Sequence, residues 1–164
     1  MRKLSLILVL FSALASAQDT TITERGGTLL RVGAKSPITL TGADADMFNV
    51  TIKAGLVQPG QCYFGMAALQ HTTGTSSVTY KISVGGTQAN FGASAATTPL
   101  GMRFWICNDP VSLTTQTVFI DVSGVSLTVF FPAINFAADV VLKIQANGAN
   151  TQAITPKMFY MRPD

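Results

Sequence analysis

The stretch that decides the fold spans residues 49–87 and reads NVTIKAGLVQPGQCYFGMAALQHTTGTSSVTYKISVGGT. Residues 62–69 form a long apolar run, and residues 78–84 alternate between apolar and polar side chains, which is typical of a half-buried β-strand. A Pro-Gly pair before the first strand and a Gly-Gly pair after the second predict turns. The polar residues 71–77 between the two strands are expected to form a loop. The stretch therefore predicts a β-meander.

The rest of the chain continues the same pattern. Short apolar runs separated by turn signals recur about every 8–12 residues, which predicts about nine or ten strands and no amphipathic helix. The composition agrees, because 48% of the 164 residues are hydrophobic and only 12% are charged. We therefore expect an all-β fold, an antiparallel two-sheet β-sandwich that is jelly-roll-like. It forms a single domain over residues 29–164, preceded by a flexible or extended arm at residues 18–28.

The first 17 residues have the pattern of a signal peptide. Arg2 and Lys3 precede an apolar run at residues 4–14, and the small residues Ala-Ser-Ala at 15–17 match a cleavage site. The apolar run is too short to span a bilayer, so no stable membrane span is expected after the leader is removed. The alternative is an uncleaved N-terminal anchor. We expect the protein to be exported, whether secreted, periplasmic or extracellular.

The leader also accounts for most of the net positive charge. It holds two of the eleven basic residues and none of the eight acidic ones, so its removal lowers the net charge from +3 to +1. The remaining Lys and Arg residues are scattered singly along the chain. A nucleic-acid-binding patch needs clustered basic residues with aromatic side chains among them. No nucleic-acid partner is therefore expected.

The two cysteines, Cys62 and Cys107, both lie in the part predicted to be exported. In an oxidising compartment such a pair can form a disulfide, and both residues lie near the start or end of expected strands. The alternative is a pair of buried free thiols that act as small hydrophobic residues. A bridge closing a loop of about 45 residues would contribute about 3–4 kcal/mol to stability.

Residues able to carry catalysis or bind a metal are few. His71 is the single histidine, and its neighbours predict a solvated loop position. No G-x-S-x-G motif is present, and neither cysteines nor carboxylates stand at metal-ligand spacing from His71. Asp44 and Asp46 are interpreted as turn-forming residues, with a contribution to a Ca²⁺ site as the alternative. Asp121 is expected to accept hydrogen bonds from the amides of the following turn. We therefore predict no enzyme activity, no catalytic residues, no metal and no cofactor.

Aromatic residues are the remaining candidates for a binding site. Trp105 alternates with Phe104 and Ile106 in a strand whose two faces are both largely apolar, so we expect that strand to be covered on both sides. One face then belongs to the core, and the other is a subunit contact or a platform for a sugar. Tyr63 and Tyr80 are further candidates for an interface or ligand platform.

Seven short sequence pieces follow one another along residues 48–146. They are TIKAGLVQPGQ at 51–61, GGT at 85–87, the strand around Trp105, IDVS at 120–123, LTV at 127–129, AADV at 137–140 and Leu142. Together they resemble the jelly-roll modules of tailed-bacteriophage virion proteins. The resemblance implies an exposed tail, fibre or head-decoration module, often trimeric, that displays loops to a cell surface and has no catalytic residues.

Three functions are consistent with these features. The favoured hypothesis is a non-enzymatic structural or surface-display subunit of a phage-like virion, which acts by oligomeric surface contact as a homo-oligomer, with a trimer favoured. Its target would be a cell-surface glycan or protein. The second is an exported bacterial adhesin or pilus-like subunit that pairs through strand edges, with residues 19–30 as the donor strand. The third is a secreted carbohydrate-binding module.

Overall fold

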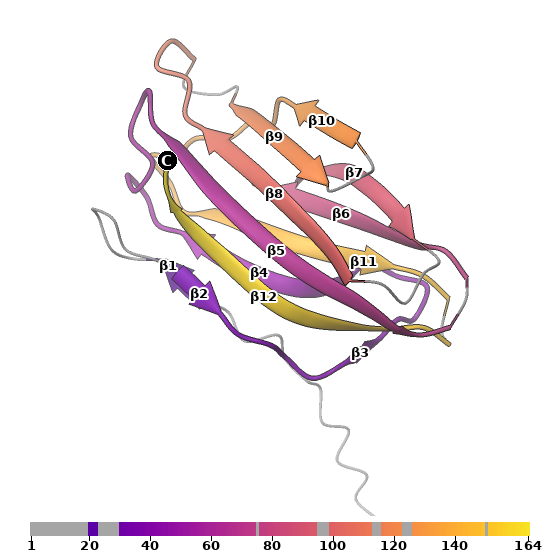
Figure 1. Ribbon diagram of the computed structural model, residues 1–164. Coiled ribbons are helices and arrows are strands. Elements are labelled where there is room, and N and C mark those ends of the chain that lie inside the picture. Colours follow the sequence, from indigo (N-terminus) through magenta and orange to yellow (C-terminus); the bar gives the residue numbers. More distant parts are fainter. Residues whose placement is uncertain are drawn as a thin grey trace, which may run out of the picture.

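The computed structural model describes residues 20–22, 30–74, 76–94, 99–112, 116–122, 126–149 and 151–164. Within these ranges it is all-β, with two sheets stacked face to face (Figure 1). The predicted two-sheet β-sandwich is therefore confirmed. The strands are β1 (Thr20–Ile22), β2 (Leu30–Val32), β3 (Ile38–Thr39), β4 (Ala45–Ile52), β5 (Cys62–Thr73), β6 (Val78–Val84), β7 (Thr87–Ser94), β8 (Pro99–Cys107), β9 (Thr117–Val122), β10 (Ser126–Phe130), β11 (Val140–Asn147) and β12 (Ala153–Pro163).

The described strands form a five-stranded and a seven-stranded sheet. The order is β1-β4-β11-β6-β7 in the first and β10-β9-β8-β5-β12-β2 in the second, where β3 also pairs with β12. The pairing of β1 with β4 is parallel, and the other pairings are antiparallel. No helix in the described residues is long and apolar enough to cross a membrane.

The N-terminal segments are only partly described. The predicted leader, residues 1–17, lies outside the described residues. Of the predicted arm at 18–28, residues 20–22 are described and form β1, which pairs with residues 50–52 of the chain's own β4. Strand β1 lies at the edge of the five-stranded sheet, and the two very short strands β2 and β3 lie at the margins of the seven-stranded sheet. The described residues hold twelve strands where about nine or ten were predicted, and β1 lies in the segment that was predicted to be an arm.

The core fills the space between the sheets with side chains from alternate strand positions. Phe48 of β4 meets Phe159 of β12 at a ring-centroid distance of 5.5 Å, and Phe159 meets Phe104 of β8 at 5.9 Å. All three rings are at most 1% exposed, and burial of each contributes about 1.5–3 kcal/mol. Gly65 of β5 is the register partner of Phe104. A Cβ at Gly65 would lie 2.0 Å from the Phe104 ring, so only glycine fits at that position.

The turn between β6 and β7 lies where the Gly-Gly pair predicted it. The two glycines that close the hairpin between β6 and β7, Gly85 and Gly86, have φ values of 59° and 88°. Positive φ at both central positions is the requirement of a type I′ turn, which suits the twist of a two-residue hairpin. Residues 147–148, Asn-Gly, carry a similar signal but do not form a hairpin. Strand β11 belongs to the five-stranded sheet and β12 to the seven-stranded sheet, so the chain crosses between layers there.

Candidate binding face

The two outer faces of the sandwich differ in chemistry. On the five-stranded sheet, Asp44 accepts hydrogen bonds from Lys81, with the Nζ–Oδ1 distance at 2.7 Å, and Asp46 pairs with Lys143 at 2.7 Å and with the Gln145 amide at 2.7 Å. The hydrogen bond from Lys81 holds the pKa of Asp44 below its ordinary value. The polar groups on this face therefore satisfy one another.

This arrangement corrects the interpretation of the two aspartates. They were expected to form a turn, with a Ca²⁺ site as the alternative. Instead Asp46 lies within β4, and both carboxylates bind lysines across the sheet. Among the described residues, no three His, Cys, Asp or Glu side chains are grouped as metal ligands.

The outer face of the seven-stranded sheet carries a row of aromatic side chains. Phe64 on β5 is the register partner of Trp105 on β8, which in turn is the register partner of Phe119 on β9. The Phe64 and Trp105 ring centroids lie 5.2 Å apart. Tyr160 on β12 meets the Phe64 ring edge-on, with a centroid distance of 6.3 Å. The Arg162 guanidinium carbon lies 5.7 Å from the centroid of the Phe64 ring. We call these five residues the aromatic row.

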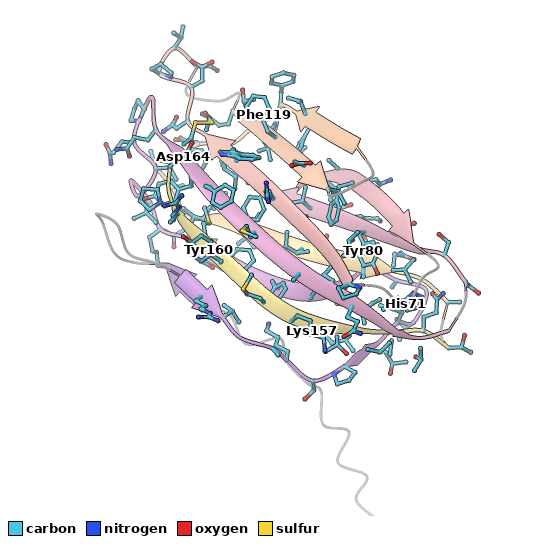
Figure 2. All side chains as sticks on the ribbon, in the orientation of Figure 1. His71, Tyr80, Phe119, Lys157, Tyr160 and Asp164 are labelled. Carbon is cyan, nitrogen blue, oxygen red and sulfur yellow. A yellow bond between two sulfur atoms is a disulfide. The ribbon has the colours of Figure 1, made fainter. Side chains whose placement is uncertain are left out.

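Strand alternation places the aromatic row on the outside. In β8, Phe104 and Ile106 are fully buried, so Trp105 between them points outward and is only partly buried. In β5, the same alternation buries Tyr63 and Gly65. Figure 2 labels Phe119 and Tyr160, which lie on β9 and β12 at the two ends of the row. Partly exposed aromatic side chains from four neighbouring strands thus form one continuous surface.

A second row runs beside the first and is partly polar. Register pairs join Met66 on β5 to Arg103 on β8, and Arg103 to Asp121 on β9. Next to them is a hollow of about 220 Å³ lined by Met66, Gly101, Met102, Arg103 and Asp121. Gly101 opens this hollow, because nothing lies within 4 Å of the place where its Cβ would be. We call Met66, Arg103 and Asp121 the polar row.

The charges of the polar row are open to a partner. The ion pairs among the described residues are Lys53–Asp139, Lys81–Asp44 and Lys143–Asp46, so Arg103 and Asp121 belong to none of them. The turn that Asp121 was expected to cap, residues 123–125, lies outside the described residues. A guanidinium donor and a carboxylate acceptor therefore stand side by side at the hollow.

A disulfide joins the strands beside the aromatic row. Cys62 on β5 and Cys107 on β8 are register partners two residues before Phe64 and two residues after Trp105, and their sulfur atoms lie 2.01 Å apart. The structure thus has the bridge and not the free-thiol alternative. The covalent link holds β5 and β8 together next to the stacked Phe64 and Trp105 rings.

Two of the three predicted platform residues lie inside the protein. Tyr63 is 5% exposed, and its hydroxyl donates a hydrogen bond to the carbonyl oxygen of Leu56 at 3.4 Å. Tyr80 is 1% exposed and stacks on Phe91, and burial raises the pKa of Tyr80 to about 12. Neither ring forms part of a surface, so their assignment as an interface or ligand platform is wrong. Both occupy inward positions in their strands.

The expected position of His71 is also wrong. The residue was expected in a solvated loop, but β5 continues to Thr73 and His71 is 1% exposed. Neither ring nitrogen has a hydrogen-bond partner. Figure 2 labels it near the far end of β5, distant from the Phe119 end of the aromatic row. The local sequence of Thr, Gly and Ser suggested a loop, and pairing of β5 with β12 overrode it.

Sequence reasoning found Trp105 but missed its neighbours. The strand of Trp105 was expected to be covered on both sides, yet no described element covers its outer face (Figure 1). Phe64 shares a strand face with Met66, and Tyr160 shares one with Arg162. Period-two alternation would have grouped each pair. Only the strand order, which is not local in sequence, brings the pairs together around Trp105.

Comparisons with known proteins add a distant likeness of fold. No protein-family model matches the chain, and no curated protein matches it. One solved structure that it resembles is peanut lectin with a nine-residue peptide, at 8% sequence identity and a TM-score of 0.38, covering 88% of this chain and 95% of that chain. At that identity and TM-score, the likeness says nothing about what this chain binds.

Proposed function

We propose that the chain is a non-enzymatic structural or surface-display subunit that contacts a macromolecular target through the aromatic and polar rows. The observation that carries this proposal is the composition of the two rows, which consist of Phe, Trp, Tyr, Met and Arg with one Asp and no Lys or Glu. Protein interfaces are enriched in aromatic residues, Met and Arg and depleted in Lys and Glu. The contrasting outer face of the five-stranded sheet is occupied by its own ion pairs.

The strongest contacts are expected around Trp105. Binding energy in protein interfaces concentrates in a few central Trp, Tyr and Arg residues. Trp105 lies between Phe64 and Phe119 in the middle of the row. Its truncation to alanine should therefore cost at least about 2 kcal/mol, or about a thirtyfold rise in Kd.

The resemblance to tailed-phage virion modules favours a setting in which many copies act together. A flat face without a deep pocket binds weakly on its own, and repetition on an oligomer raises the overall affinity without any new contact. We propose a homo-oligomeric virion-like or exported particle as that setting, with a cell-surface glycan or protein as the target. The leader at residues 1–17 remains a prediction within this proposal.

The test is binding of the fluorescently labelled mature chain to intact cells of a panel of bacteria. We expect Trp105→Ala to raise the apparent Kd about thirtyfold or more. The matched control is Val141→Ala, because Val141 is an exposed apolar residue on the opposite sheet, at 38% exposure. Equal binding by wild type and Trp105→Ala would refute the role of the aromatic row.

A secreted carbohydrate-binding module is the second candidate. Its specific support is the polar pair Arg103 and Asp121 at the hollow, beside the indole of Trp105. A guanidinium donates to and a carboxylate accepts from sugar hydroxyls, while an aromatic ring packs on the apolar face of a sugar. A glycan array with wild type, Trp105→Ala and Asp121→Asn tests this. Loss of one glycan signal in both variants supports it, and no glycan signal for wild type excludes it.

A further inference from the structure

Strand β10 is the outermost strand of the seven-stranded sheet. It pairs with β9 on one side, and no described strand of its sheet pairs with it on the other (Figure 1). An edge strand presents unpaired N–H and C=O groups that can pair with another chain, and proteins usually protect such edges with charges, Pro, bulges or short length.

The other described sheet edges carry such protection. Strands β1 and β2 have three residues each, and β2 includes the charged Arg31. Strand β7 exposes the polar side chains of Gln88 and Asn90, and its pairing with β6 is interrupted by a register shift. Strand β10 has none of these features, because its sequence SLTVF contains no charge and no Pro. Among the described edges it is thus the one that is longer than three residues, uncharged and free of a register shift.

The exposed apolar side chains gather at this edge. Phe119 on β9 is 36% exposed, Val129 on β10 is 40% exposed, and Phe131 directly after β10 is 64% exposed. Phe119 and Val129 are register partners, so the apolar surface continues from the aromatic row to the open edge. Three of the five large exposed hydrophobic residues in the described part of the chain are these.

The hydrogen-bond phase of β10 shows which groups face outward. Gln116 donates its backbone N–H to the carbonyl oxygen of Pro132 at 3.0 Å. This pair continues the β9–β10 register, in which bonded and non-bonded pairs alternate. The bonded positions on β10 are therefore 126, 128 and 130. The backbone N–H and C=O groups of Leu127 and Val129 point away from β9, toward the open edge.

We propose that a second copy of the chain pairs with this edge, β10 against β10, in antiparallel orientation. The contact is two-fold and isologous, with Val129 opposite Val129 and residue 131 opposite residue 127. In this register all outward-facing backbone groups from 127 to 131 find partners. The seven-stranded sheets then join into one continuous sheet, which brings the two aromatic rows together on one surface. The larger binding surface matters only if the proposed function holds, whereas the pairing of β10 with β10 does not depend on that function.

The size of the mature chain in solution tests the pairing. Light scattering across a dilution series should give a dimer for wild type, and Val129→Lys should raise the dimer Kd at least about tenfold, because two lysines would face each other. The control is Val141→Lys, which adds the same charge at nearly the same exposure, 38% against 40%, on the opposite sheet. It should leave the dimer unchanged. A monomer or a trimer for wild type, or equal effects of the two variants, would overturn the proposal.

Amide hydrogen exchange followed by NMR locates the contact. The amides of Leu127 and Val129 should exchange rapidly in dilute protein and become protected as the concentration rises. The amides of residues 128 and 130, which bond to β9, should be protected throughout. Unchanged exchange at 127 and 129 in a dimeric sample would refute β10 as the contact. Cell binding by Trp105→Ala tests the proposed function separately, so either idea can fail without the other.

Discussion

Replacing Gly65 by alanine should destabilise the protein strongly, although alanine usually suits a strand better than glycine. The added Cβ would lie 2.0 Å from Cζ and 2.3 Å from Cε2 of Phe104. Ordinary carbon contacts are 3.4–4 Å, so the ring would have to retreat by more than 1 Å. Phe104 is fully buried, and the Phe159 ring with a centroid distance of 5.9 Å blocks that movement.

The expected magnitude follows from two opposing terms. Overpacking a dense core costs about 1–3 kcal/mol and occasionally more, and an overlap this deep into a rigid ring lies at the high end. Removing a glycine from a strand returns about 0.5–1 kcal/mol. We expect Gly65→Ala to lower the free energy of unfolding by about 2–3 kcal/mol. For a domain of this size that is a fall in Tm of about 4–12 °C.

The assay is urea unfolding of wild type and variant, followed by tryptophan fluorescence and circular dichroism. Gly101→Ala is the matched control, because it lies in β8 with nothing within 4 Å of its Cβ position. It should leave stability unchanged or raise it by up to about 1 kcal/mol. Phe104→Leu combined with Gly65→Ala should recover part of the loss, which would be visible as non-additivity. A neutral or stabilising Gly65→Ala would refute the close packing of Phe104 on the β5 backbone.

Three further outcomes are expected. Folding raises the pKa of Tyr80 to about 12, against an ordinary value of 10.0. The free energy of unfolding should therefore fall above pH 10, by at most about 1.4 kcal/mol per pH unit. In urea titrations from pH 9 to 11.5, Tyr80→Phe should show a smaller fall of the unfolding free energy with pH. His71→Leu should raise stability by about 1–2 kcal/mol, because it removes two buried nitrogens without partners; a loss in thermal unfolding would contradict this. The double variant Cys62→Ser with Cys107→Ser should lose about 3–4 kcal/mol, since the bridge closes a separation of 45 residues; unchanged stability under reduction would argue against it.

Local sequence was sufficient for the fold class. Alternation with a period of two marks strand faces, and glycine pairs such as Gly85 and Gly86 fix turn geometry, because both effects act between near neighbours. The same signal marked Trp105 as lying opposite the buried Phe104 and Ile106. The same alternation in residues 62–69 puts Tyr63 on one strand face with Gly65, Ala67 and Leu69, which is the buried face.

The tertiary structure alone decided which strands are neighbours, and with that the binding face. Phe64 and Tyr160 lie far from Trp105 along the chain, and only the order β9-β8-β5-β12 sets these rings beside Trp105 and Phe119. The same long-range pairing buried His71, which its Thr- and Gly-rich neighbours had marked as loop. Alternation in the sequence shows which side chains of one strand lie on each of its two faces. Sheet order depends on contacts between distant segments, so it appears only when the whole core is assembled.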